Sequence, residues 1–382
     1  MTLERIGAIT LAADENKIMA AVIDNINGFA YFACGVTWDQ GKVVKIRLSD
    51  FTKIDPAVTF AVGEYQAGSG VIDESNCFAY FGTCCTSDGK IYKIDLNTFT
   101  QLPTLGIPTG DDRAAAIDEL NGFAYFGSTF LEPTTIYKIR LSDFSNYAQL
   151  TLSTGERQPE CAAIDTTNGF VYFAVGTGGG TPFAPIKLVK VRLSDFTRVD
   201  ALDLSPYGVG TNRIDAISID NNKEYAYLSI SGFPARIFKV RLSDLTLISI
   251  LTLDIEANLQ GYPETSVICQ DFLYIGLDMY TSDWDDAPIR LVKIRLSDFS
   301  EVQHIDFNPE EKWPWGSEPS IIDLNKGFIY IGTYTSPAII VKVYDSDIIG
   351  AAAVPYLPGR PPFRRTGASV SGGIECGRGK ER

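Results

Sequence analysis

Histidine is almost missing from this chain, which has His304 as its single histidine in 382 residues. Catalytic triads, histidine-ligated zinc sites and histidine proton shuttles all need this residue. The G-x-S-x-G elbow of hydrolases is also absent, and the Gly178–Gly180 run lacks the strand and helix that a phosphate loop requires. These absences exclude the commonest hydrolytic and phosphoryl-transfer sites.

Long apolar runs and an excess of basic residues are missing as well. The N-terminus has no apolar run of signal-peptide length, and no stretch reaches the length of a membrane-spanning helix. The net charge is −14, from 33 Lys and Arg against 47 Asp and Glu. The lack of long apolar runs predicts no membrane span. The negative charge predicts no nucleic-acid partner, because most of the surface would repel phosphates. The sequence assigns no compartment, and an extracellular or surface location applies if the chain is a fragment.

The seven cysteines are an odd number and lack the paired spacing of zinc sites. We expect most of them to be reduced and buried, with a disulfide between neighbouring repeats as the alternative.

One unit recurs seven times along the chain. It combines A-x-I-D, a short turn, F-A-Y-F-G-T, a variable loop and Y-K-I-R-L-S-D-F-T. The second motif places tyrosines 45 to 56 residues apart, at Tyr31, Tyr80, Tyr125, Tyr172, Tyr227, Tyr274 and Tyr330. The last motif contributes Lys45, Lys93, Lys138, Lys190, Lys239, Lys293 and Lys342.

Each unit is predicted to form four strands, here called a to d. Strand a precedes Ile-Asp, strand b is F-A-Y-F-G, strand c is the alternating Y-K-I-R-L, and strand d follows D-F-T. Asn-Gly pairs such as Asn27-Gly28 supply the positive φ of a tight a–b turn. Seven four-stranded units of this length predict an all-β fold, a seven-bladed β-propeller.

The last unit lacks a strand d, and Arg5–Leu11 matches that pattern. We predict that this N-terminal strand completes the last blade and covers its open edge. The propeller is predicted to span residues 1–353. Residues 354–382 are rich in Pro and Gly and carry six Lys and Arg against two Asp and Glu, which predicts a flexible basic tail.

Several repeated side chains have predicted structural roles. The aspartates of the Ile-Asp motif should cap turns, and His304 should lie exposed on an outer strand. The repeated Lys-Ile-Arg of strand c should form an exposed charged face that deters edge pairing. Five phenylalanines in one register should pack between blades: Phe51, Phe99, Phe144, Phe196 and Phe299.

The units resemble the YVTN/NHL-type propeller repeats of surface proteins and several enzymes. Phe81–Thr83 stands where V-T-N would be, and Ile91–Thr100 stands where the following V-S-V-I-D-T-A-T run would be. The resemblance covers roughly residues 5–347 and implies the propeller fold. Such propellers host many functions, so it implies no single activity.

The beginning of strand a should lie at the mouth of the central channel. The aligned residues there are Met19, Gly68, Arg113, Glu160, Asp215, Glu264 and Glu318. Four of them are acidic. Converging carboxylates suit a divalent cation, so Glu160, Asp215, Glu264 and Glu318 are candidate metal ligands. The alternative is a solvated ring of acids paired with arginines, with no cofactor.

Tryptophan gathers on the predicted loop face. Trp284 lies in the b–c loop of blade six, Trp313 and Trp315 lie in the loop leading into blade seven, and Trp38 lies in the b–c loop of blade one. Variable loops on a rigid scaffold commonly carry binding sites, and exposed Trp is typical of binding surfaces. The alternative is that each ring caps its own loop.

Two functions follow from these patterns. The first is a non-enzymatic binding or scaffold protein, a monomer whose loop face recognises a protein or a carbohydrate through these tryptophans. The second is a metal-dependent lyase or hydrolase with an acidic channel-mouth site. A third possibility is that the chain is a repeat segment of a larger surface protein.

Overall fold

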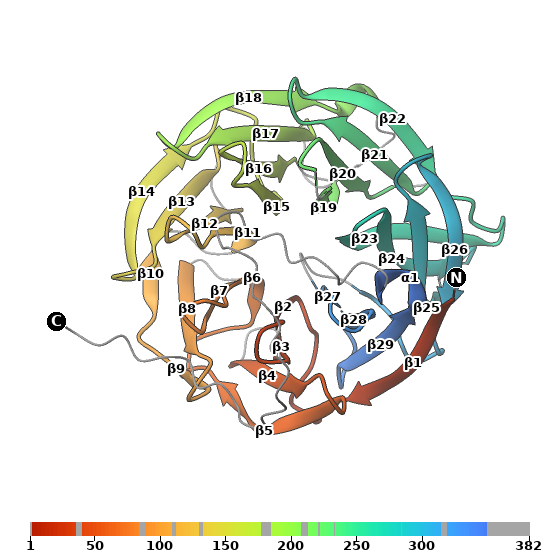
Figure 1. Cartoon of the computed structure of the whole chain (residues 1–382), viewed down its shortest axis with the longest axis horizontal. Coiled ribbons are helices and arrows are strands. Elements are labelled where there is room, and N and C mark those ends of the chain that lie inside the picture. The colour runs from red at the N-terminus through yellow and green to blue at the C-terminus, as the bar shows by residue number, and fades with distance from the viewer. Residues whose placement is uncertain are drawn as a thin grey trace, which may run out of the picture.

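The computed structural model describes residues 2–35, 40–83, 89–108, 112–129, 133–176, 185–207, 213–220, 222–232, 234–283, 285–314 and 319–349. In this part of the chain, seven antiparallel sheets are arranged in a ring (Figure 1). Strand a of each sheet lies near the centre and strand d lies on the rim. The predicted seven-bladed β-propeller is therefore confirmed.

The first four blades follow the chain from strand a to strand d. Their strands are β2 (Ala20–Asp24), β3 (Phe29–Gly35), β4 (Gly41–Arg47) and β5 (Thr52–Thr59); β6 (Ala67–Asp73), β7 (Phe78–Thr83), β8 (Gly89–Asp95), β9 (Thr100–Gln101) and β10 (Leu105–Ile107); β11 (Asp112–Asp118), β12 (Phe123–Ser128), β13 (Thr135–Arg140) and β14 (Ser145–Thr151); and β15 (Pro159–Asp165), β16 (Phe170–Val175), β17 (Lys187–Arg192) and β18 (Thr197–Asp203). The outer strand of blade two is divided into β9 and β10 around Pro103, which has no N–H to donate to β8.

The other three blades complete the ring. Their strands are β19 (Ile214–Ile219), β20 (Tyr225–Ile230), β21 (Arg236–Arg241) and β22 (Thr246–Thr252); β23 (Leu259–Cys269), β24 (Phe272–Thr281), β25 (Asp286–Arg295) and β26 (Ser300–Asp306); and β27 (Ser320–Asp323), β28 (Phe328–Gly332), β29 (Ile339–Asp345) and β1 (Leu3–Thr10). Two short helices are described, η1 (Ser205–Tyr207) and α1 (Ser346–Ile349). Among the described residues, no helix has the length and apolar composition that crossing a bilayer requires.

The N-terminal strand closes the ring as predicted. β1 pairs antiparallel with β29, from Leu3 opposite Asp345 to Thr10 opposite Ile339. In Figure 1 it lies on the rim, in the position that strand d has in the other blades. The edge of β29 is therefore paired rather than open.

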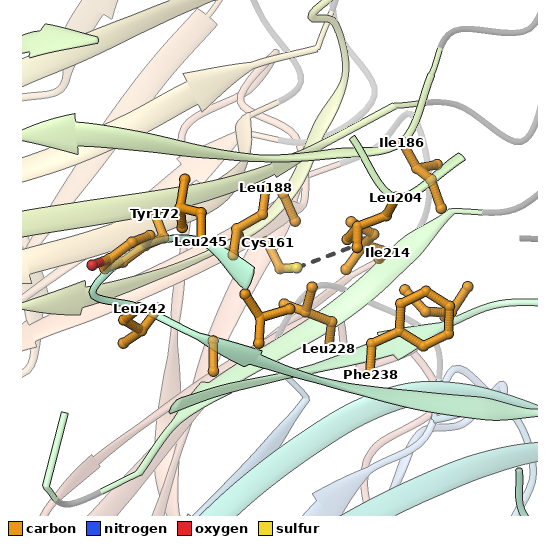
Figure 2. Packing of buried hydrophobic residues seen from close by; sticks show 14 of the residues in the cluster. Cys161, Tyr172, Ile186, Leu188, Leu204, Ile214, Leu228, Phe238, Leu242 and Leu245 are labelled. Carbon is orange, nitrogen blue, oxygen red and sulfur yellow. Dashed lines mark hydrogen bonds between the residues drawn. The ribbon is translucent and has the colours of Figure 1, made fainter. Parts of the chain in front are cut away.

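Apolar clusters between adjacent blades form the core. Figure 2 shows the cluster between blades four and five, where Leu188 and Leu204 pack against Leu228 and Phe238. The Cys161 thiol of this cluster donates to the carbonyl of Ile214 at 3.6 Å. Core packing therefore links each sheet to the next and holds the ring together.

The repeated phenylalanines reach across the blade boundaries, as predicted. Phe99, Phe144, Phe196 and Phe299 each lie 5.7 Å from the strand b tyrosine of the preceding blade. Phe51 makes the same contact with Tyr330, so blade one packs on blade seven like any other pair. The aspartates of the Ile-Asp motif cap their turns; for example, Asp24 Oδ1 accepts from the Asn27 N–H at 2.8 Å. His304 is exposed on β26.

The prediction of an exposed Lys-Ile-Arg face was wrong for its lysines. In all seven blades the strand c lysine places its Nζ 3.7–4.2 Å from the centroid of the aromatic ring that begins strand b. Lys138, Lys190, Lys293 and Lys342 are buried. Burial lowers the pKa of the Lys138 ammonium. Because an aromatic face attracts a cation, the lysine is part of the contact between blades.

The four described cysteines fall into two groups. Cys34, Cys161 and Cys269 are reduced and buried, as expected for thiols that pack as small apolar side chains. Cys77 is disulfide-bonded, which departs from the expectation that the cysteines are reduced.

Candidate functional site

Bulges in the innermost strands bring the predicted ring of charges to the channel mouth. The pairing of strands a and b shifts register at five aligned positions, Gly68, Arg113, Glu160, Asp215 and Glu264. A bulged residue leaves the strand alternation, and its side chain is directed differently from its neighbours. The sequence alignment therefore identified a real structural register.

The three described acids of this ring, Glu160, Asp215 and Glu264, are buried and paired with arginine rather than solvated. Arg113 Nη1 lies 3.2 Å from Glu160 Oε2. Arg213 Nε donates to Asp215, and its Nη2 lies 3.3 Å from Glu264 Oε2. Burial raises the pKa of Asp215 to about 6 and also raises that of Glu264. The Arg213 guanidinium thus pairs with two buried carboxylates, those of Asp215 and Glu264.

Metal binding by the ring stays a prediction. Among the described residues, no three acidic, cysteine or histidine side chains are close enough together to hold an ion. Glu318, the fourth proposed ligand, lies outside those residues.

Below the ring, the channel is apolar. A cavity of about 280 Å³ is lined by small or aliphatic side chains of the innermost strands, among them Ala21, Gly70, Ile217, Ser266 and Ser320. It offers few polar groups to a ligand.

Blade six differs from the other blades in the length of its strands. β23 has 11 residues and β24 and β25 have 10 each, whereas β27 and β28 of blade seven have 4 and 5. Much of the predicted b–c loop of blade six is therefore part of a strand hairpin formed by β24 and β25. This longer hairpin of β24 and β25 is here called the blade-six wall.

A pocket of about 860 Å³ lies against this wall. Blade six contributes residues from β23 and β24, and the loops before β2, before β27 and after β28 contribute the others. The lining residues are Lys17, Tyr262, Glu264, Asp278, Tyr280, Trp313, Tyr334 and Ser336. Four aromatic rings and two carboxylates thus surround one concave space, which Glu264 connects to the charged ring.

Hydrogen bonds hold the walls of the pocket together. Trp313 Nε1 donates to Asp286 Oδ1 at 3.1 Å, which ties the loop before β27 to the hairpin of blade six. The Tyr334 N–H donates to the Trp313 carbonyl at 2.7 Å, and the Lys17 N–H donates to the Thr335 carbonyl at 2.9 Å. The pocket is therefore built from three blades, six, seven and one, that meet beside the closure of the ring.

Asp278 is the exceptional residue of the pocket. Its side chain is buried, with the residue only 5% exposed, and Oδ2 accepts from the Tyr280 hydroxyl at 2.8 Å. Oδ1 has no hydrogen-bond partner among the described residues. Burial, and then the nearby charge of Asp286, raises the pKa of Asp278 to about 7. A buried acceptor without a partner destabilises a fold, and such groups commonly mark functional sites.

The structure places part of the predicted aromatic surface here. Trp313 lines the pocket, while Trp38, Trp284 and Trp315 lie outside the described residues. Sequence analysis missed Lys17, Tyr262, Asp278 and Tyr334. A signal existed for one of them, because Lys17 and Trp313 each lie two residues after a buried glutamate, Glu15 or Glu311, and share a left-handed backbone with φ of 56° and 53°.

Fold and site together define a seven-bladed β-propeller with a ligand-sized pocket on its loop face. No family model and no curated protein matches the chain. Among solved structures, the chain is similar to hydrazine synthase of Kuenenia stuttgartiensis, with a TM-score of 0.68 and 11% identity over 87% of this chain and 97% of that one. Identity at this level supports the shared fold alone.

Proposed function

We propose that this protein is a non-enzymatic binding propeller that recognises a carbohydrate in the loop-face pocket between blades six and seven. The observation that carries the proposal is the combination of four aromatic rings with two buried carboxylates around one concave space. Aromatic faces pack on the apolar C–H faces of sugar rings, and carboxylates accept hydrogen bonds from sugar hydroxyls.

The shape of the site supports a small ligand or a chain end over a flat protein surface. A volume of about 860 Å³ lies within the range of roughly 300–1,000 Å³ that is common for small-molecule sites. A stable protein interface generally needs a broad contact of about 1,600 Å². A partner protein would therefore have to insert a side chain or an attached glycan.

The arrangement of the aromatic rings supports the same proposal. Tyr262 and Tyr280 lie edge to face, with centroids 5.8 Å apart and planes at 83°. Trp313 is fixed by its bond to Asp286 on the adjoining wall. Rings held in place before binding lose little conformational freedom when a ligand packs against them.

A glycan array followed by titration calorimetry tests the proposal. Trp313→Ala should weaken binding of the selected glycan by about tenfold or more, while Trp313→Phe should retain most of the affinity. The matched control is Tyr207→Ala, which removes an exposed aromatic from η1, outside the pocket. Absence of any glycan ligand, or equal losses in Trp313→Ala and Tyr207→Ala, would reject the proposal.

A further inference from the structure

We infer that the pocket selects a ligand carrying a positively charged amine, so that the carbohydrate of the proposed function, on which this inference rests, is an amino sugar with a free amino group. The inference depends on the charge and the hydrogen-bonding state of the pocket rather than on its shape.

Asp278 lacks a cationic partner. It forms no ion pair with the described residues, and the side chain that donates to its carboxylate is the neutral Tyr280 hydroxyl. Its other oxygen is buried and unpaired while lining the pocket. An ammonium group is a donor of three hydrogen bonds and could satisfy this oxygen and the charge at once.

The neighbouring ion pairs do not supply the missing positive charge. Arg213 is shared between Asp215 and Glu264, so this trio has one negative charge in excess when both acids are ionised. Arg113 forms an ion pair with Glu160. Asp286 brings a further carboxylate to the wall, where it accepts the bond from Trp313. Among the described residues, the part of the pocket lining that blade six contributes therefore contains no cationic side chain.

The aromatic walls favour the same ligand charge. A cation is attracted to the face of a Tyr or Trp ring within about 6 Å. The opposite wall already shows this interaction, because Lys17 Nζ lies 5.1 Å from the centroid of the Tyr334 ring. Tyr262 and Tyr280 offer comparable rings beside Asp278. An amine bound there would have a carboxylate on one side and aromatic rings on the other.

The amino sugar combines both requirements. Its ring can pack on Trp313 and the tyrosines, and its ammonium group can reach the Asp278 carboxylate. N-acetylation removes the charge and two donors from the same nitrogen without changing the sugar ring. The free and acetylated forms are therefore a matched pair of probes for this inference.

The experiment is titration calorimetry at neutral pH with chitosan oligosaccharides and their fully N-acetylated counterparts of equal length. The free amine form should bind about tenfold or more tightly than the acetylated form. Asp278→Asn should remove this preference by weakening the amine form alone. Asp283→Asn is the matched control, because it removes an exposed carboxylate from the same hairpin and should leave both affinities unchanged.

The outcomes separate this inference from the proposed function. Equal affinity for both forms, or equal losses in Asp278→Asn and Asp283→Asn, overturns the amine preference while the carbohydrate site stands. Binding of neutral sugars alone would likewise overturn the amine preference and leave the carbohydrate site standing. Failure to bind any glycan overturns both, and binding of a lysine peptide in its place would assign the pocket to a protein side chain. Circular dichroism of each variant establishes that it is folded.

Discussion

Replacing Asp278 by asparagine should make the unliganded protein more stable at neutral and alkaline pH. The substitution keeps the shape of the side chain and an oxygen that can accept the Tyr280 hydroxyl, but it removes the buried charge. In the wild type, the unfolded chain loses the Asp278 proton at a lower pH than the folded protein does, because burial raises the folded pKa from 3.8 to about 7. The folded state therefore loses stability as pH rises between these two values.

The magnitude follows from this interval. Each pKa unit corresponds to about 1.4 kcal/mol, so a rise from 3.8 to about 7 lowers wild-type stability by roughly 4 kcal/mol above pH 7. With an unfolding entropy of about 2.1 cal/mol/K per residue, this difference raises the melting temperature of the variant by about 5 °C. At about pH 4 the two proteins should melt nearly together.

Differential scanning fluorimetry from about pH 4 to about pH 8 measures the effect. The advantage of Asp278→Asn should grow through this range and level off above the folded pKa. Asp283→Asn, which lies exposed on the same hairpin, should follow the wild type at every pH. A variant no more stable than the wild type at about pH 8, or one whose advantage is largest in acid, would refute the reasoning.

Three further predictions concern the scaffold. Deleting residues 2–10 removes β1 and should cause association and a large loss of melting temperature, which light scattering and fluorimetry would detect; an unchanged monomer would contradict it. Phe196→Ala should lower the free energy of unfolding by about 3–5 kcal/mol in urea titrations, whereas Arg192→Ala at an exposed ion pair should change it by less than about 1 kcal/mol. Glu156→Ala should lower it by about 3 kcal/mol, because the buried Glu156 carboxylate pairs with Arg198; a neutral effect would show that the pair is dispensable.

Much of the fold could be predicted because the same local pattern is repeated seven times. Apolar alternation defines strands b and c, and the turn residues define where each strand ends. The unmatched strand at Arg5–Leu11 sufficed to predict closure. The lysine of strand c was misassigned because alternation assigns a charged residue to the solvent face. The sequence pattern does not reveal that aromatic rings of two blades surround that position.

The candidate site was less accessible to prediction because it is not repeated. The ring through Glu160, Asp215 and Glu264 could be found by alignment, since each residue lies at the same bulge. The pocket combines Lys17 with Asp278, which are far apart in the sequence and meet through ring closure. Besides the shared spacing of Lys17 and Trp313, the unusual length of β24 was a second signal, which a search for differences among the repeats would have found.

Closure by β1 also has a consequence for how the protein is made. β1 is synthesised before the other strands of the ring, and its partner β29 ends at Asp345, so β1 stays unpaired until nearly the whole ring has left the ribosome. Strand pairing over such a long sequence separation forms slowly, and unpaired strand edges that promote aggregation stay exposed until it has formed. Translation speed over the segment that encodes β29, and any tag that hinders pairing of residues 3–10, should therefore affect the yield of soluble protein.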